Sequence, residues 1–306
     1  MPVASSEFIH PADAAALENL KAIPLFNTCI STFLKLGLER YVHGIFLSKN
    51  IRLSERQLPA IYKHLPPICE LFGIRVPDLY LEMSPYPDAY TIGEENVSIC
   101  VTSGLLEIMD EEELHAVIAH ECGHIACGHM LYHTLAQFLL FTGAHLFMPL
   151  EMVAEPVKMA LRYWNRRCEL SADRAGAVAV GSSKPIVSTM IRLAGGPRSI
   201  TDAVNLDVYL EQAEAYEKLS DSKWDKALQS VAVQFTDHPF LAVRTREIRE
   251  WGATDQFQRL VQAIAEQKGP KCVKCGRAMD PKWKFCNYCG AGVTASAITA
   301  AIGEKA

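Results

Sequence analysis

The stretch HECGHIACGH, residues 120–129, contains three histidines and one glutamate within ten positions. Residues four apart project from one face of a helix, so the imidazoles of His120 and His124 can close on one metal ion. Glu121 lies one position round the helix, where it can reach a water bound to the metal. Zinc suits imidazole, and with three protein ligands it keeps one position open for that water, whose pKa it lowers to about 7. The stretch therefore predicts a catalytic zinc site.

An alternative interpretation is a helix whose polar residues lie on a solvated face. Asp110 is a typical helix N-cap and the acidic residues 111–113 suit the positive end of a helix dipole, so a helix is predicted through the motif. His129 and His133 extend this predicted helix as core or supporting groups. Apolar residues flank the motif at Leu114, Val117, Ile118, Ile125 and Ala126. This apolar face places the histidines near a core rather than on a free surface.

A third metal ligand must come from elsewhere in the chain. The metzincin extension needs glycine at 127 and histidine at 130, where this chain has Cys127 and Met130. The later stretch CELSADRAG (168–176) offers Glu169 as a ligand, with Asp173 four residues on as acceptor for the N–H of a ligand histidine. The other interpretation is a solvated Glu–Asp pair beside the arginines at 166, 167 and 174.

The motif HExxH followed by ExxxD, with SGLLEIMDEEELHAVIAHECGHI (103–125) and TDHPFLAVRTREI (236–248), resembles the HtpX-like and CAAX-prenyl-protease-like family of zinc metallopeptidases. The resemblance runs from about residue 55 to about residue 250. It implies a gluzincin site, with zinc held by His120, His124 and Glu169 and with Glu121 as general base. It also implies cleavage of peptide bonds within unfolded or membrane-associated proteins. Asp88-Ala89 is a departure, since family members usually carry Asn-Ala there.

His238 also matches the family pattern, in which a histidine before proline lies close to the active site, and Arg244 follows at the expected distance. An imidazole there can stabilise the oxyanion of the tetrahedral intermediate, or fill the open coordination position in a resting form. A second interpretation is a helix N-terminus with Pro239 at the first helical position. We predict His238 as a catalytic residue, with Asp173 and Arg244 supporting the metal ligands.

The segment CVKCGRAMDPKWKFCNYCG (272–290) has two CxxC pairs separated by ten residues, a pattern typical of a zinc ribbon. We predict a structural zinc bound by Cys272, Cys275, Cys286 and Cys289. Lysines and aromatic residues surround the pairs, but four thiolates and one zinc carry a charge of −2 that such lysines offset. A role in protein docking or substrate capture is therefore favoured over nucleic-acid binding. The other six cysteines are interpreted as buried thiols: Cys29, Cys69, Cys100, Cys122, Cys127 and Cys168.

The predicted fold class is α+β, a mainly helical zincin-type metalloprotease domain with a small β-sheet, plus the terminal ribbon. Strands are predicted at 78–83 and 96–101. Helices are predicted at 11–38, 54–72, 134–148, 151–180, 184–194, 204–219, 222–234, 239–250 and 254–268. Ser54 begins a predicted capping box, and Pro66-Pro67 is expected to interrupt that helix. The predicted organisation is an N-terminal helical segment (1–53), the peptidase domain (54–268), the ribbon (269–291) and a tail of disordered composition (292–306).

A net charge of −5 gives no global attraction to nucleic acid or anionic lipid, and the N-terminus lacks a secretory signal, so a cytoplasmic location is predicted.

The apolar stretch 135–153 raises the question of a membrane span. A single crossing would separate His124 from Glu169, which must meet at one ion. Burial is favoured, and peripheral contact, with Trp164 and nearby arginines at the headgroups, is the alternative.

The first functional hypothesis is a zinc endopeptidase acting on extended or unfolded polypeptide, in which Glu121 activates the zinc-bound water. The substrate would add as a strand to a sheet edge near 97–101. A second hypothesis is a catalytically silent or self-inhibited zinc-binding scaffold that docks proteins through the ribbon. A third is an enzyme dedicated to a single processed substrate.

Overall fold

The structure is a computed structural model that describes residues 2–23, 26, 30, 38–141, 148–218, 241–268, 274, 285 and 289–292. The chain divides into two units, Pro2–Gly252 and a second that contains Ala253–Ala306. The first unit is mainly helical with one small sheet, in agreement with the predicted α+β class. The predicted ribbon boundary after residue 268 lies outside the described residues and stays a prediction.

The sheet has four strands in the order β1-β2-β4-β3. They span Ile51–Arg52 (β1), Asp78–Glu82 (β2), Ala89–Ile92 (β3) and Ser98–Thr102 (β4). β4 runs parallel to β2 and antiparallel to β3, and all five of its residues are buried. The prediction of a substrate-binding edge near 97–101 is therefore wrong, because β4 is paired on both sides. β3, which sequence patterning missed, forms one edge of the sheet.

The chain before and around the sheet departs from the predicted long helices. α1 (Pro11–Lys21) ends well before residue 38, and α3 (Leu38–Lys49) precedes β1. Ser54 pairs with Gln57 in a tight turn and caps no helix. The break falls between α4 (Pro59–Tyr62) and α5 (Leu65–Phe72), so the two prolines lie in the first turn of α5, where a missing N–H costs little.

α7 (Glu111–Ala126) carries the motif and begins as predicted. The Asp110 side chain accepts from the Glu113 backbone N–H at 2.7 Å, and the Glu113 carboxylate accepts from the Asp110 N–H at 2.9 Å, which completes a capping box. α7 ends at Ala126, followed by Gly128 with a φ of 71°. His129 and His133 therefore do not continue this helix.

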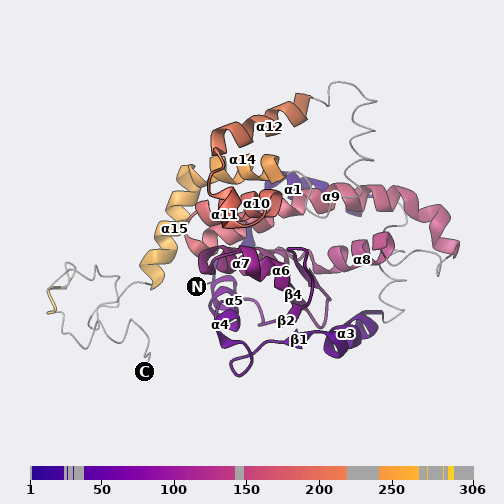
Figure 1. The fold of residues 1–306 in the computed structure, drawn as a ribbon, viewed down its shortest axis with the longest axis horizontal. Coiled ribbons are helices and arrows are strands. Elements are labelled where there is room, and N and C mark those ends of the chain that lie inside the picture. Colours follow the sequence, from indigo (N-terminus) through magenta and orange to yellow (C-terminus); the bar gives the residue numbers. More distant parts are fainter. Residues whose placement is uncertain are drawn as a thin grey trace. The chain divides into compact units, whose positions relative to one another are not determined.

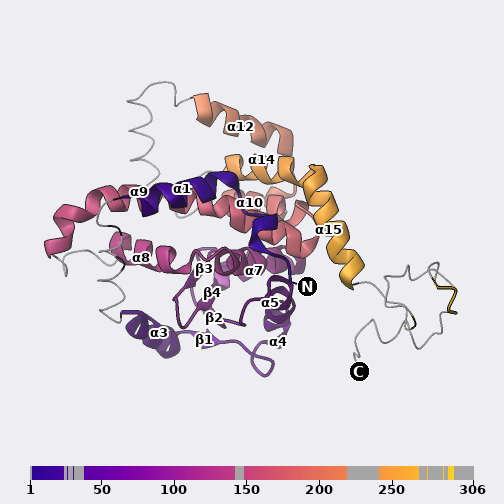
Figure 2. The same cartoon turned by 180° about the vertical axis from the view of Figure 1, so that it is seen from behind.

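α7 packs against α9 (Met148–Val180), and lies between the sheet and the helices α9 and α10 (Lys184–Gly195) (Figures 1 and 2). Glycine permits the close approach of α7 and α9: a methyl group at Gly123 would lie 2.5 Å from the Cβ atom of Ala175. Residues 120–124 on one helix and 169–173 on the other are thereby brought face to face.

The remaining helices in the described part of the first unit are η1 (Ser5–Glu7), α6 (Ser103–Ile108), α8 (Met130–Phe141), α11 (Arg198–Thr201), α12 (Leu206–Lys218) and α14 (Leu241–Gly252). α1 packs along α9, and a core cluster joins these helices to α8. Trp164 belongs to this cluster and is fully buried, so the alternative that placed it at lipid headgroups is wrong. Leu135 and Ala136 are buried there too, while residues 142–147 lie outside the described residues. No helix in the described part of the chain is long and apolar enough to cross a membrane.

In the second unit, α15 (Asp255–Lys268) matches the predicted helix at 254–268. Phe285 and Gly292 form an isolated antiparallel bridge, and Cys289 lies in a turn between them. Cys272, Cys275 and Cys286, like the predicted helix at 222–234 and the tail from 293 on, fall outside the described residues. The four-cysteine site stays a prediction.

Candidate metal centre

Three side chains from α7 and α9 converge on one point. Nε2 of His120 lies 3.3 Å from Nε2 of His124. The two carboxylate oxygens of Glu169 lie 3.5 Å from these nitrogens, Oε2 from His120 and Oε1 from His124. Two imidazole nitrogens and a carboxylate form a donor set that zinc binds in open sites. The donors present therefore fit a catalytic zinc.

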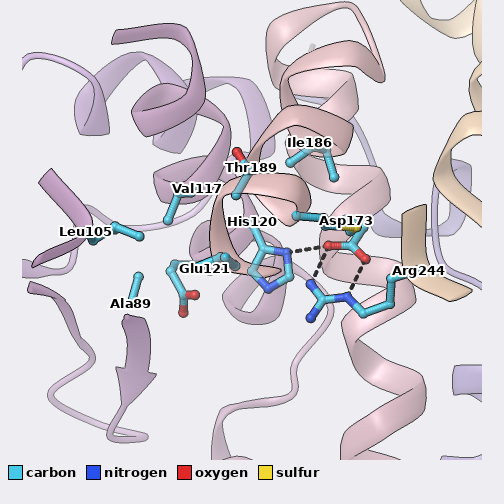
Figure 3. A pocket seen from close by; sticks show the side chains of 11 residues that line it. Ala89, Leu105, Val117, His120, Glu121, Asp173, Ile186, Thr189 and Arg244 are labelled. Atoms are coloured by element: carbon cyan, nitrogen blue, oxygen red, sulfur yellow. Dashed lines mark hydrogen bonds and ion pairs between the residues drawn. The ribbon is translucent and has the colours of Figure 1, made fainter. Parts of the chain in front are cut away.

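Asp173 and Arg244 contact two of these donors, His120 and Glu169; Figure 3 shows both residues beside His120. Oδ1 of Asp173 lies 2.9 Å from Nδ1 of His120, so Nδ1 carries the proton and Nε2 keeps its lone pair for a metal. Arg244 donates two hydrogen bonds to Asp173, at 2.8 Å and 2.7 Å, and its Nη1 lies 2.9 Å from Oε2 of Glu169. The structure thus brings Asp173 and Arg244 to the candidate ligands, as the sequence predicts.

The electrostatics favour a cation at this point. Burial alone would raise the pKa of Glu169 and Asp173, but the guanidinium of Arg244 and the imidazoles outweigh it, so both pKa values fall below their usual range. Burial lowers the pKa of His120, yet Asp173 and Glu169 raise it to about 10 in the metal-free chain. Both carboxylates are therefore ionised, and a proton or a metal ion at Nε2 of His120 is strongly stabilised.

His124 is held through a second chain of contacts, in which the sequence predicted His129 as a core or supporting group but did not predict Asp13. Its Nδ1 lies 3.1 Å from Nδ1 of His129, and Nε2 of His129 lies 3.0 Å from Oδ2 of Asp13 on α1. Trp164 and Ser171 also donate to this carboxylate, at 3.0 Å and 2.6 Å. With the His129 proton facing Asp13, the other nitrogen of His129 accepts from His124. The lone pair of His124 Nε2 is left free for the metal.

One sequence signal points to Asp13. It occupies the buried stripe of α1 together with Ala16 and Leu20, at spacings of three and four residues. A carboxylate in such a stripe needs a buried partner.

Glu121 points away from these ligands toward β3. Thr91 on β3 donates a hydrogen bond to its Oε2 at 2.6 Å, and the glutamate is only 5% exposed. Figure 3 shows its carboxylate beside Ala89, on the side of His120 opposite Asp173. A group placed next to the ligands but not among them suits a general base.

A small cavity of about 40 Å³ opens beside His120 and Glu121. Arg244 and Asp173 contribute polar atoms, and the other walls are mostly apolar: Ala89, Leu105, Val117, Ile186, Thr189, Met190 and Leu193. A cavity with apolar walls next to a metal centre suits an uncharged substrate side chain. His238, the predicted catalytic residue, lies outside the described residues.

The free energy of unfolding of the metal-free chain is expected to fall as the pH drops below about 6.5. Burial lowers the pKa of His129 and holds that of His133 well below its usual value, so both stay neutral when folded. In the unfolded chain both imidazoles take protons below a pKa of about 6.5. The folded chain is therefore favoured above that pH, and its free energy of unfolding falls below it by at most about 1.4 kcal/mol per pH unit for each histidine.

Denaturant unfolding at about pH 6 and about pH 5 measures this difference. The raised pKa of His120 stabilises the folded chain as the pH falls, but this effect is nearly complete below the unfolded pKa of about 6.5, so it changes little over this interval. His133→Gln removes one of the two groups and should reduce the difference. An unchanged free energy of unfolding between the two pH values would contradict the prediction.

Comparisons with known proteins identify the family of the chain. The model of peptidase family M48 matches residues 69–252. The chain is 33% identical to the plastoglobule-localized metallopeptidase 48, chloroplastic, of Arabidopsis thaliana, over 84% of this chain and 76% of that protein. It is 26% identical to a protease HtpX homolog of Pelotomaculum thermopropionicum, over 53% of this chain and 68% of the relative. No solved structure matches the chain.

The family match covers more than half of the chain and includes α7, α9 and α14, which supply the candidate ligands and their supports. A hydrolase that cleaves peptides is therefore expected from both the geometry and the relatives. The chain belongs to peptidase family M48.

Proposed function

We propose that the chain is a zinc-dependent endopeptidase that hydrolyses peptide bonds in extended or unfolded protein segments. One observation carries the proposal. The donors of His120, His124 and Glu169 face one another within 3.5 Å, with Glu121 beside them and none of these side chains on an open surface. The buried donors favour a bound cation, and the adjacent carboxylate supplies the base that hydrolysis needs.

The roles follow from the contacts. Zinc held by His120, His124 and Glu169 would supply a Lewis acid that polarises a carbonyl and lowers the pKa of a water to about 7. Glu121 accepts a proton from the attacking water and delivers it to the leaving amine. Thr91 orients the Glu121 carboxylate through its hydrogen bond. Asp173 and Arg244 hold His120 and Glu169 in place, and His238 is proposed to stabilise the oxyanion.

The substrate is proposed to lie along β3. Among the described residues this strand pairs with β4 alone, and its first residue, Ala89, lines the cavity beside Glu121. An extended peptide on the other side would pair through its main chain, which makes little demand on its sequence. The apolar cavity would then accept one uncharged side chain of the peptide. Extended and unfolded segments suit such a site better than folded domains.

Hydrolysis of a denatured protein is the direct test. Activity that a zinc chelator abolishes and added zinc restores is the expected result. A chain that binds zinc at this site but never cleaves denatured protein would instead support the scaffold hypothesis. The adjacent base at Glu121 disfavours that hypothesis. Cleavage of one particular protein, with no turnover of generic ones, would indicate a dedicated processing enzyme.

Two zinc ions per chain are expected, one at the candidate site and one at the proposed ribbon of Cys272, Cys275, Cys286 and Cys289. Metal analysis of the purified chain measures this number. The double variant Cys272→Ser/Cys275→Ser should retain one zinc ion and hydrolytic activity, because the ribbon ion takes no part in the chemistry. Loss of both ions in that variant would contradict two independent sites. A role of the ribbon in docking a protein partner is part of this proposal.

A cytoplasmic location with peripheral membrane contact through residues 135–153 stays a proposal. The name of the Arabidopsis relative places that protein at plastoglobules. Cell fractionation tests the proposal. Recovery in the membrane fraction that high salt or mild alkali releases is expected for peripheral contact, whereas release only by detergent would oppose it.

A further inference from the structure

A second set of metal donors overlaps the candidate catalytic site. His133 on α8 and Cys168 on α9 lie beside His124 and Glu169, and one ligand atom from each of the four residues falls within 4.8 Å of the others. Nε2 of His133 lies 3.2 Å from Sγ of Cys168, and the rings of His124 and His133 are 4.5 Å apart. Neither His133 nor Cys168 has a role in the proposed hydrolysis.

The spacing suits a closed zinc site. Zinc bonds of about 2.0 Å to nitrogen and about 2.3 Å to sulfur set tetrahedral ligands about 3.5 Å apart. The His133–Cys168 separation of 3.2 Å and the His124–Glu169 separation of 3.5 Å are both close to this value. Two imidazoles, one carboxylate and one thiolate together balance the charge of a zinc ion. A buried position favours an ion and ligands whose charges sum to zero.

The two donor sets cannot be filled at the same time. A neutral imidazole has one lone-pair nitrogen and one N–H. When the proton of His129 lies on the nitrogen beside Asp13, the N–H of His124 faces His129 and Nε2 is the nitrogen of His124 left for a metal. An ion bound with His133 and Cys168 would therefore take His124 away from an ion bound with His120. The two sets are alternatives for a single ion.

We propose that one zinc ion has two positions in this chain. In the open position His120, His124 and Glu169 bind it and leave room for water. In the closed position His124, His133, Cys168 and Glu169 bind it, the thiol proton passes to solvent, and no coordination position remains. Hydrolysis stops while the ion is there. The inference rests on the proposed catalytic zinc for its functional meaning, but the closed position can be observed without any activity.

Cobalt substitution in the full chain tests the closed position, because a thiolate ligand to Co²⁺ gives an intense near-ultraviolet charge-transfer band and a His–His–Glu site does not. His120→Ala removes a ligand of the open position only. We expect this variant to keep the same number of cobalt ions per chain as the unsubstituted protein and to show a stronger thiolate band. The double variant His120→Ala/Cys168→Ser should lose one cobalt ion per chain and the added band.

The ribbon cysteines also bind cobalt, so the comparison uses difference spectra among chains that share an intact ribbon. Cys100→Ser is the matched control: Cys100 is a buried thiol on β4, and its replacement in the His120→Ala chain should leave the band unchanged. Loss of one cobalt ion from His120→Ala without a stronger band would overturn the closed position, as would a band that Cys168→Ser does not alter.

Hydrolysis of a denatured protein by the unsubstituted chain is measured in parallel. No hydrolysis, together with cobalt retained by His120→Ala, would reject the proposed function and keep the closed site. Hydrolysis by the unsubstituted chain, together with loss of one cobalt ion from His120→Ala, would keep the proposed function and reject the closed site.

Discussion

Glu121→Gln is expected to lower kcat/KM by about 10²-fold to about 10⁴-fold, the usual contribution of general acid–base catalysis. Glutamine has nearly the same shape as glutamate and can still accept the hydrogen bond from Thr91, so the fold and the neighbouring ligands should be unchanged. The amide cannot accept a proton from water. Zinc content should therefore equal that of the unsubstituted chain. Initial rates on a denatured protein, with metal analysis of the same sample, measure both quantities.

Thr91→Val is the matched control for Glu121→Gln. It removes the hydrogen bond to the Glu121 carboxylate but leaves the base itself. We expect a smaller loss of kcat/KM than in Glu121→Gln, since the carboxylate remains but is less well oriented. Full activity in Glu121→Gln would reject the assignment of this residue as general base. An equal loss in both variants would indicate that Thr91 acts in the chemistry and not only in orientation.

Local patterns predicted much of the site. Spacing along one helix placed His120 and His124 on one face, and the spacing of Glu169 and Asp173 did the same on a second helix. Asp110 predicted the start of the first of these helices. Each of these features depends on residues within one turn or two, where chain geometry alone decides which side chains share a face.

Features that depend on distant pairing were missed. β3 is only four residues long and follows a turn-rich segment, so its alternation gives too weak a pattern to recognise. The edge of the sheet was assigned to the wrong strand because strand order depends on how distant segments pair, not on the pattern of any one strand. Asp13 reaches His129 because α1 packs on α9, and its hydrogen bond with Ser171 joins residues 158 positions apart.

Asp13→Ala is expected to lower the free energy of unfolding by about 3–5 kcal/mol, the usual cost of removing one partner from a buried charged contact. The Asp13 side chain is fully buried. Its removal leaves three polar groups facing a space without an acceptor: the Nε2–H of His129, the Nε1–H of Trp164 and the hydroxyl of Ser171. Each costs about 1–3 kcal/mol when its partner is lost. Denaturant unfolding at neutral pH measures the change.

The same substitution should weaken zinc binding by at most about 10-fold to about 100-fold, the usual effect of removing a partner that orients a metal ligand, because Asp13 acts on His124 through His129. Without Asp13 the proton of His129 is free to move to Nδ1, where it would oppose the N–H of His124 across the 3.1 Å contact. His124 would then turn a protonated nitrogen toward the metal. Competition with a chelator of known affinity measures the change separately from unfolding.

Glu18→Ala is the matched control, because Glu18 lies on the exposed face of the same helix α1. It should change the free energy of unfolding by no more than about 0.5 kcal/mol and leave zinc affinity as it was. Asp13→Asn keeps one acceptor oxygen and should fall between the two variants. If Asp13→Ala lowers stability but not zinc affinity, Asp13 serves the packing of α1 alone. If Asp13→Ala lowers both the free energy of unfolding and zinc affinity, and Glu18→Ala changes neither, then α1 supports the metal centre through His129.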